Sequence, residues 1–344
     1  MTRLNNESQE PILARREARP KHYGWRDQIR TAFRDPHQLL TYLGLDGQQL
    51  SIPENYRFPM LVPAAFAERM AFGDASDPLL RQVLPDLTEN EPVAGFTADP
   101  VGDHASRQTS GLLHKYAGRV LLITTGACAI HCRYCFRQAF PYSSERASAD
   151  RWQQAVSYIE AHPDVEEVIL SGGDPLMLST TRLSELTDRL RPIGHIQRLR
   201  LHTRLPVVLP DRVTDSLCQW ITSLPWPVVV VIHANHAREF DHSVDDALAR
   251  LRQAGAHLLN QSVLLAGVND QETVLVELMQ RSFAAGVIPY YLHLLDRVEG
   301  AARFERDRQV ALELHESMRL RLSGYLVPRL VREVAGAPYK LPVL

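Results

Sequence analysis

The stretch RVLLITTGACAIHCRYCF, residues 119–136, joins an apolar run to a loop that holds three of the chain's four cysteines. The run at 119–126 is rich in aliphatic residues and predicts a buried strand. Cys128, Cys132 and Cys135 follow it directly, at spacings of four and three. Four randomly placed cysteines would cluster in this way in about one such chain in two thousand, so the spacing indicates a site.

Five further apolar runs repeat the strand pattern: 166–173, 198–203, 227–234, 257–265 and 288–295. Segments with helical periodicity separate them, such as TRLSELTDRLR and VDDALARLRQAG. Strand alternating with helix at this rhythm predicts parallel βα units. Six units predict an α/β fold with a partial (β/α)6 barrel, incompletely closed, and a doubly wound open sheet is the alternative.

Polar and glycine residues cluster where these predicted strands end, in TTGAC, SGGDP, HTRLP, HANH, NQS and HLLD. In parallel α/β architectures the C-terminal edge of the sheet holds the active site. The sequence therefore predicts an active site at that edge.

The rest of the chain divides around this barrel, which we expect over residues 101–303. Residues 1–100 predict a helical and loop-rich region, with short helices in DPHQLLTYLGL and PAAFAERMAFG and a polar connector in LTENEPVAGFTADPVGDH. Residues 304–344 predict a helix, then the extended SGYLVPRLVREV, then AGAPYKLPVL. This last segment is expected to close the barrel or to act as a lid.

Composition excludes several classes of protein. The 45% hydrophobic content is enough for a full core, and no apolar run approaches the ~20 residues that a membrane span needs. The net charge of −2, with arginines scattered among acids, gives no support for nucleic-acid binding. The start of the chain lacks a signal-peptide core. We therefore expect a cytoplasmic protein, where thiols stay reduced.

The three clustered cysteines predict a soft-metal site. A disulfide would leave an odd thiol and suits an oxidising compartment. Structural zinc needs four ligands, and His131 is available as the fourth, so zinc stays open. A [4Fe–4S] cluster held by three cysteines would leave one iron open to an exogenous ligand.

The motif Cys128-x3-Cys132-x2-Cys135, with Tyr134 inside it, resembles the signature of radical S-adenosylmethionine (SAM) enzymes. The resemblance implies a [4Fe–4S] cluster whose open iron binds SAM, and reductive cleavage of SAM to a 5′-deoxyadenosyl radical. SGGDP at 171–175 is similar to the segment that binds the SAM amino group. The SAM-binding residues implied in this way are Gly172, Gly173, Asp174, Arg204, His233 and Gln261.

The likeness extends over more than half the chain, through GLLHKYAGRVLL, CRYCFRQAFPY, SGGDPLM, RLPVVLP, NQSVLL, PYYLHLLD and SGYLVP. Together these motifs resemble the lysine 2,3-aminomutase family. The closest resemblance is to the branch that makes β-lysine for translation elongation factor P. DPLLRQVLP at 77–85 and the few residues after Lys340 also resemble that branch.

The family adds pyridoxal phosphate (PLP). The resemblance implies that Lys340, in GAPYK, binds PLP covalently, and that Lys115, Tyr116 and Arg119 bind its phosphate. In the family this lysine follows a glycine-rich run, which is reduced here to a single glycine in 336–339.

The substrate residues are implied in the same way. Arg137 matches the position that binds the α-carboxylate, and Asp296 and Glu333 match acids that bind a side-chain ammonium. Two carboxylates fit lysine and would repel an anionic side chain such as that of glutamate. In metabolic lysine aminomutases the position of Glu333 is an aspartate.

The sequence thus predicts an isomerase that converts L-α-lysine to β-lysine, for β-lysylation of elongation factor P. The implied partners are free L-lysine, a flavodoxin- or ferredoxin-type reductant, and a functional link to a β-lysine ligase, and the family forms homo-oligomers. One alternative is a metabolic lysine 2,3-aminomutase. Others are a radical SAM enzyme without PLP that acts on another amino acid, and a non-enzymatic iron–sulfur or zinc protein.

Overall fold

The computed structural model describes residues 24–45, 50, 52–140 and 149–344. The polar start of the chain and the end of the predicted motif CRYCFRQAFPY lie outside these residues.

The core of the protein is one sheet of ten strands, ordered β1 to β10 as they occur in the chain. The six predicted strands are all present, and each pairs in parallel with the next. A doubly wound sheet would reverse its strand order at a switch point, so this sequential order confirms the barrel prediction. These strands are β3 (Arg119–Thr125), β4 (Glu167–Gly172), β5 (Arg198–Thr203), β6 (Val228–Ile232), β7 (His257–Val263) and β8 (Ile288–His293).

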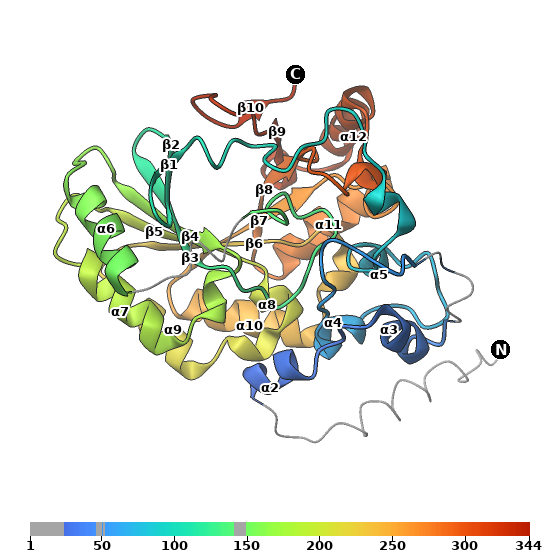
Figure 1. Cartoon of the computed structure of the whole chain (residues 1–344), viewed down its shortest axis with the longest axis horizontal. Helices are drawn as coiled ribbons and strands as arrows, with labels where there is room; N and C mark the ends of the chain where they lie inside the picture. The colour runs from blue at the N-terminus through green and yellow to red at the C-terminus, as the bar shows by residue number, and fades with distance from the viewer. Residues whose placement is uncertain (1–23, 46–49, 51, 141–148) are drawn as a thin grey trace.

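Helices connect the parallel strands and cover the outer face of the sheet (Figure 1). Ser179 and Thr214 cap α7 and α9, because each side chain accepts a hydrogen bond from a first-turn backbone N–H. The connecting helices are α6 (Ala149–Glu160), α7 (Thr180–Leu190), α8 (Leu205–Val208), α9 (Asp215–Ser223), α10 (His242–Gln253), α11 (Glu272–Ala284) and α12 (Arg308–Arg321). Short 3-10 helices are η3 (Leu87–Asn90), η4 (Pro175–Met177), η5 (Pro210–Arg212), η6 (Ala237–Glu239), η7 (Ala302–Phe304) and η8 (Gly324–Leu326).

The sheet is larger than predicted at both edges. The extended segment SGYLVPRLVREV contains β9 (Arg329–Arg332), which pairs in parallel with β8 as a seventh parallel strand. β10 (Leu341–Pro342) pairs antiparallel with β9. At the other edge, β1 (Arg107–Thr109) and β2 (Leu112–Tyr116) add antiparallel strands to β3. β1 and β10 end the sheet, so the barrel is incompletely closed, as the sequence predicts.

The described residues between 24 and 100 are helical and loop-rich. Within these described residues the α-helices are α2 (Trp25–Arg30), α3 (Pro36–Tyr42), α4 (Ala64–Ala67) and α5 (Pro78–Arg81). DPHQLLTYLGL forms α3, whose cap Asp35 accepts from the backbone N–H of His37. PAAFAERMAFG forms only the four-residue α4, shorter than predicted.

Strand β5 shows how the pattern of side chains creates an interior cavity. Leu199 and Leu201 are buried and do not line the cavity, whereas Arg200 and His202 alternate with them and line the cavity inside the sheet. The period of two places polar groups inside the barrel and apolar groups under the helices. In the described part of the chain, no helix is both long enough and apolar enough to cross a membrane.

Candidate active site

One cavity of about 630 Å³ runs along the inside of the curved sheet. Its lining includes strand starts, such as Arg119 of β3 and Glu167 of β4, as well as the loops that follow the strands. The prediction that the site lies at the C-terminal edge is therefore incomplete. Every residue singled out from the sequence lines this cavity: Cys128, Cys132, Cys135, Gly172, Gly173, Asp174, Arg204, His233, Gln261, Lys115, Tyr116, Arg119, Arg137, Asp296, Glu333 and Lys340.

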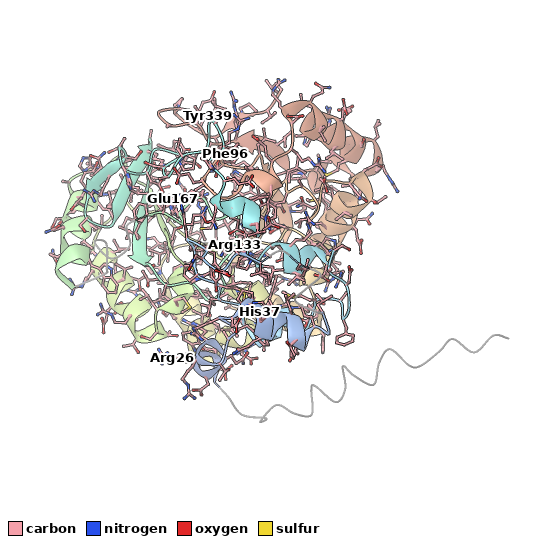
Figure 2. The ribbon with its side chains drawn as sticks, turned by 45° about the vertical axis from the view of Figure 1, so that its right-hand side comes forward. Arg26, His37, Phe96, Arg133, Glu167 and Tyr339 are labelled. Carbon is pink, nitrogen blue, oxygen red and sulfur yellow. The ribbon has the colours of Figure 1, made fainter. Side chains whose placement is uncertain are left out.

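The cysteine loop is held by the N-terminal region. The backbone N–H of His131 donates to the carbonyl of Leu61 at 2.9 Å, and that of Arg133 donates to the carbonyl of Gln82 at 2.8 Å. The Arg133 side chain is 2% exposed, lies near the middle of the molecule in Figure 2, and forms an ion pair with Glu89. A buried arginine without such a partner would be strongly unfavourable, so Glu89 fixes the loop.

The three thiols fit a cluster better than a single metal ion. Burial and the neighbouring Cys135 raise the pKa of Cys128, and burial and Cys132 raise the pKa of Cys135 to about 12. A bound metal supplies the positive charge that makes such thiols ligands. Among the described residues, no three His, Cys, Asp or Glu side chains are grouped to hold one ion, whereas cluster thiolates bind different irons. His131, the candidate fourth zinc ligand, instead hydrogen-bonds the Pro59 carbonyl at 2.9 Å.

Two glycines lie at the end of β4, Gly172 as its last residue and Gly173 just after it, because the end of β3 and the residues that follow it lie directly against them. Gly172 has φ of 111°, and a Cβ there would be 2.6 Å from the Thr125 carbonyl oxygen. A Cβ on Gly173 would be 2.4 Å from the Ala127 oxygen. The backbone N–H groups of Gly173 and Asp174 donate to those two carbonyls at 2.7 and 2.8 Å. This close approach brings SGGDP against the start of the cysteine loop.

Asp174 is a buried acceptor that joins the ends of β4 and β5. Its carboxylate accepts from the Thr203 hydroxyl and the Arg204 N–H at 2.7 Å, and from the Leu176 and Leu205 N–H groups at 3.0 and 3.1 Å. Burial raises the pKa of Asp174 to about 6, against the effect of these bonds. These contacts organise the turn, and the contact with the SAM amino group stays a prediction.

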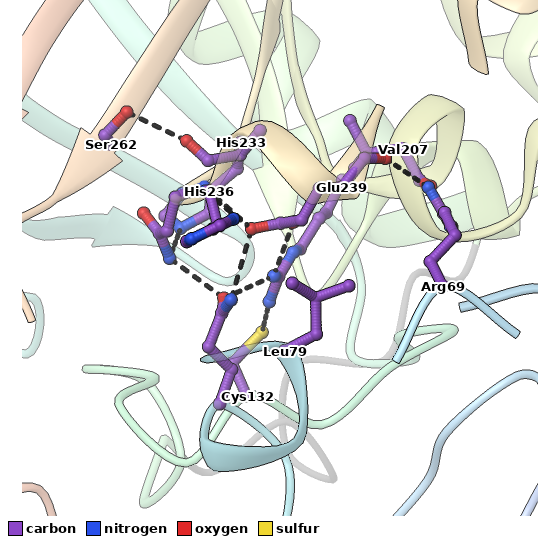
Figure 3. Close-up of polar contacts among 12 residues, drawn as sticks. Arg69, Leu79, Cys132, Val207, His233, His236, Glu239 and Ser262 are labelled. Atoms are coloured by element: carbon purple, nitrogen blue, oxygen red, sulfur yellow. Dashed lines mark hydrogen bonds and ion pairs between the residues drawn. The ribbon is translucent and has the colours of Figure 1, made fainter. Parts of the chain in front are cut away.

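Cys132 and Glu239 belong to one buried polar network (Figure 3). Arg204 contacts both of these residues. Its guanidinium donates to Cys132 Sγ at 2.6 Å, to Gln82 Oε1 at 2.7 Å and to Glu239 Oε2 at 2.9 Å. Glu239 is fully buried, so the pair is screened from water. Burial and Arg204 lower the pKa of His233 to about 3, so its imidazole is neutral at physiological pH. Neither Gln82 nor Glu239 was predicted as a site residue. Gln82 lies in DPLLRQVLP, which was noted only for its resemblance, and Glu239 is far from the cysteines in the chain.

Glu333 is the centre of the charged group at the other end of the cavity. Lys115 Nζ donates to one of its oxygens at 2.9 Å, and Lys340 Nζ donates to the other. Burial alone would raise the pKa of Glu333, but the two lysines outweigh it and hold the pKa below its ordinary value. Burial and Glu333 raise the pKa of Asp296 to about 7 and also raise the pKa of Tyr116.

The segment that carries Lys340 is tethered to the sheet. β10 begins at the next residue and pairs with β9, and Val343 is buried. Gly336, which remains from the glycine-rich run, has φ of 77° and supplies the turn that returns the chain to β9. Lys340 therefore lies on a paired segment that helps to close the cavity.

Arg137 and Lys115 meet at a carboxylate that the sequence did not reveal. Asp103 Oδ2 accepts from Arg137 Nε at 2.6 Å, and Asp103 Oδ1 is 2.6 Å from Lys115 Nζ. Asp103 lies in the segment predicted as a simple connector. Arg137 also donates to Ser171 Oγ at 3.3 Å.

Other residues, to which the sequence analysis assigned no role, also line the cavity. Arg200, which forms an ion pair with Glu167 at 2.9 Å, and His202 both line the cavity. Their alternation with leucines in RLRLHT was a usable signal. Tyr290 and Tyr291 line the same wall, with ring centroids 3.8 Å apart.

The residues at this end fit a phosphate-bearing cofactor that attaches to a lysine. Lys340 and Lys115 both contact Glu333, and the Arg119 guanidinium lies 4.6 Å from the centroid of the Tyr116 ring. Cations suit a phosphate, and aromatic rings suit a flat heterocycle.

A curved parallel sheet around a cavity that gathers three cysteines defines the class of radical SAM enzymes, and residues 122–279 match the family described as the radical SAM superfamily. The chain is 43% identical to an L-lysine 2,3-aminomutase of Escherichia coli, over 94% of this chain and 95% of that protein. It is 41% identical to one of Haemophilus influenzae, over 96% and 97%. A third, from Buchnera aphidicola, is 38% identical over 92% and 94%.

This chain belongs to the lysine 2,3-aminomutase family of radical SAM enzymes. It is therefore an isomerase, and the family's cofactors are a [4Fe–4S] cluster, SAM and PLP.

Proposed function

We propose that this protein is a PLP-dependent enzyme that converts L-α-lysine to β-lysine by a 2,3-amino shift. One observation carries the proposal: a single cavity gathers the three cysteines, the lysine predicted to bind PLP, and two acids suited to an ammonium group. The geometry supports a reaction in which radical generation and amino-group transfer occur in the same enclosed space.

The cofactors, when bound, supply an organic radical from SAM and a conjugated carrier for the amino group from PLP. Cys128, Cys132 and Cys135 would hold the cluster, and SAM would lie against SGGDP and the ends of β5, β6 and β7. Lys340 would attach PLP at the opposite end of the cavity. The role of the protein is to fix these groups in place and to exclude water and stray hydrogen donors.

The substrate is recognised by charge at both of its ends. Arg137 would bind the α-carboxylate in a bidentate, charge-assisted pair. Asp296 and Glu333 would bind the side-chain ammonium, and they lie close enough for Glu333 to raise the pKa of Asp296. An incoming ammonium would favour the ionised form of Asp296 and relieve this repulsion.

The product would serve translation rather than metabolism. A β-lysine ligase would attach the β-lysine to elongation factor P in the cytoplasm. A flavodoxin- or ferredoxin-type protein would supply the electrons that reduce the cluster. DPLLRQVLP at 77–85, which contains α5, supports this branch by its resemblance. Deleting the gene and measuring the mass of elongation factor P would test this role, and an unchanged mass would favour the metabolic alternative.

The chemical proposal is tested by anaerobic reconstitution with iron, sulfide and PLP, followed by SAM, a reductant and L-lysine. We expect β-lysine in the chromatogram, and none from Cys132→Ala or Lys340→Ala. Cys218→Ala is the matched control, because Cys218 lies on α9 and does not line the cavity. Cleavage of SAM without β-lysine would leave the radical chemistry intact and refute the substrate assignment.

A radical SAM enzyme without PLP remains the second candidate, and absorbance separates the two. A PLP-loaded protein should show a visible absorption band that Lys340→Ala lacks. An active enzyme that contains no bound PLP would favour a radical SAM reaction that does not use PLP.

A further inference from the structure

Asp103 connects two groups that the proposed function assigns to different ligands. Arg137 is predicted to hold the substrate carboxylate, and Lys115 the cofactor phosphate. The carboxylate of Asp103 lies between them, at 2.6 Å from Arg137 Nε and 2.6 Å from Lys115 Nζ. Asp103 is 1% exposed, so these two ion pairs form away from bulk water, where the attraction between opposite charges is stronger.

The backbone around Asp103 is folded against the C-terminal segment. The N–H of Asp103 donates to Asp99 Oδ1 at 2.9 Å, and the carbonyl of Val101 accepts from Lys115 Nζ at 2.8 Å. Gly102 has φ of +68°, and a Cβ there would be 2.9 Å from the Cβ of Ala335. The turn therefore places the Asp103 carboxylate by backbone geometry rather than by a freely moving loop.

The charges at this end alternate along one chain of contacts. Arg137 contacts Asp103, Asp103 contacts Lys115, and Lys115 contacts Glu333. Glu333 in turn contacts Lys340. Burial alone would raise the pKa of Asp103, but Arg137 and Lys115 outweigh it and hold the pKa below its ordinary value. Asp103 is thus a permanent negative charge between two cations.

We propose that Asp103 is a positioning residue, which holds Arg137 and Lys115 at a fixed separation and orientation for the carboxylate and the phosphate of their two ligands. This inference rests on the proposed function. A bond to Nε fixes the plane of a guanidinium, and the bridging carboxylate offsets the repulsion between the two cations. Asp103 acts through these side chains and does not line the cavity itself.

The test is Asp103→Asn in the reconstituted holoenzyme. Asparagine keeps the shape but offers one neutral acceptor, so both cations lose a charged partner. We expect the KM for lysine to rise about tenfold or more, with kcat changed less than about threefold. The PLP dissociation constant, measured by absorbance titration without turnover, should also rise about tenfold.

The matched control is Asp99→Asn, the same chemical change in the same segment. The Asp99 carboxylate accepts hydrogen bonds from the backbone N–H groups of Asp103 and His104. The side-chain carbonyl of an asparagine can still accept from these groups. We expect KM and PLP affinity within about twofold of the parent. An effect as large as that of Asp103→Asn would assign the result to loop placement and overturn the proposal.

A second variant covers the case in which Asp103→Asn does not fold, which thermal unfolding will show. Asp103→Glu keeps the charge but moves the carboxylate by one methylene. It should retain PLP affinity within about threefold while the KM for lysine rises by at least that factor. Parent-like KM and PLP affinity in Asp103→Glu and, where it folds, Asp103→Asn would overturn the inference.

Failure of the proposed function is a distinct result. A parent enzyme that binds PLP but leaves lysine unchanged refutes the substrate assignment, and the PLP titration of Asp103→Asn still tests the Lys115 half of the inference. A parent enzyme that binds no PLP refutes both.

Discussion

The two ends of the cavity are built in different ways. At the cluster end, three cysteines lie within eight residues of one loop, beside two buried ion pairs, Arg204–Glu239 and Arg133–Glu89. At the amino-acid end, the charged side chains come from segments far apart in the chain, and Lys115 and Glu333 are 218 residues apart. The first end depends on a local motif, and the second depends on the closing of the whole sheet.

Because of this difference, we expect mutations at one end to leave the other end unchanged. At the cluster end each buried arginine has its own carboxylate partner, and burial raises the pKa values of Cys128 and Cys135. The amino-acid end is a chain of alternating charges. Removal of one charge leaves a buried neighbour without its partner, so a single substitution there should also weaken binding by residues that it does not contact.

The largest effect is expected for Cys135→Ala. Loss of one of three cluster ligands should reduce bound iron and SAM cleavage to background. PLP affinity should stay within about twofold, because no lysine is changed. Iron analysis, SAM cleavage and PLP titration on one preparation would check this. Loss of PLP binding together with iron would show that the ends are not independent.

The reverse experiment is Lys340→Ala. We expect β-lysine formation to fall to background, since the predicted covalent attachment of PLP is lost. Iron content should be unchanged. Borohydride reduction followed by peptide mapping should label residue 340 in the parent and not in the variant. A label on another lysine would refute the assignment of Lys340.

A smaller effect is expected from pH, through Asp296. Its pKa of about 7 means that the acid is mostly neutral below that value and ionised above it. Affinity for a substrate ammonium should therefore rise with pH, and the KM for lysine should fall by up to about tenfold between pH 6 and 8. Glu333, Lys340, Lys115 and Asp103 are the charged groups that act on it.

Asp296→Asn should remove this dependence and leave KM high at every pH. Glu299→Gln is the matched control, since Glu299 is exposed and contacts Arg57. A parent profile that is flat, or one that survives in Asp296→Asn, would assign the titration to another group.

The smallest effect is expected on the outer face. Ser179→Ala removes the cap of α7 and should lower the free energy of unfolding by about 1 kcal/mol in urea titrations. KM for lysine and iron content should not change, because α7 covers the sheet from outside. Thr181→Ala, an exposed first-turn change, should be nearly neutral. A shift in KM would show that the outer helices also tune the cavity.

The sequence predicted the parallel strands and helices well because their signals are periodic and local. The apolar runs and the helical segments between them each indicate one element, so the barrel could be built from the pattern. β2 was missed, because LLHKY lacks a clear alternation. β9 was expected only as an extended segment, because four residues do not reveal which strand they join.

The site was predictable only in part, for the same reason. The cysteine motif is local, whereas Lys340 and Glu333 were recognised by resemblance alone. Asp103 was missed because its partner Arg137 is 34 residues away and nothing near Asp103 marks it. Gln82 lies 122 residues from Arg204, and Glu239 lies 35 residues from it. Contacts of this kind leave no trace in a single sequence.

The long span of the Lys115–Glu333 contact has a consequence during translation. A ribosome releases the cysteine loop and most of the barrel well before residue 333 emerges, and domains begin to fold from their N-terminal side. The amino-acid end cannot form until the last strands have joined the sheet. Assembly of the nascent protein would then favour insertion of the cluster first and attachment of the vitamin B6 cofactor last.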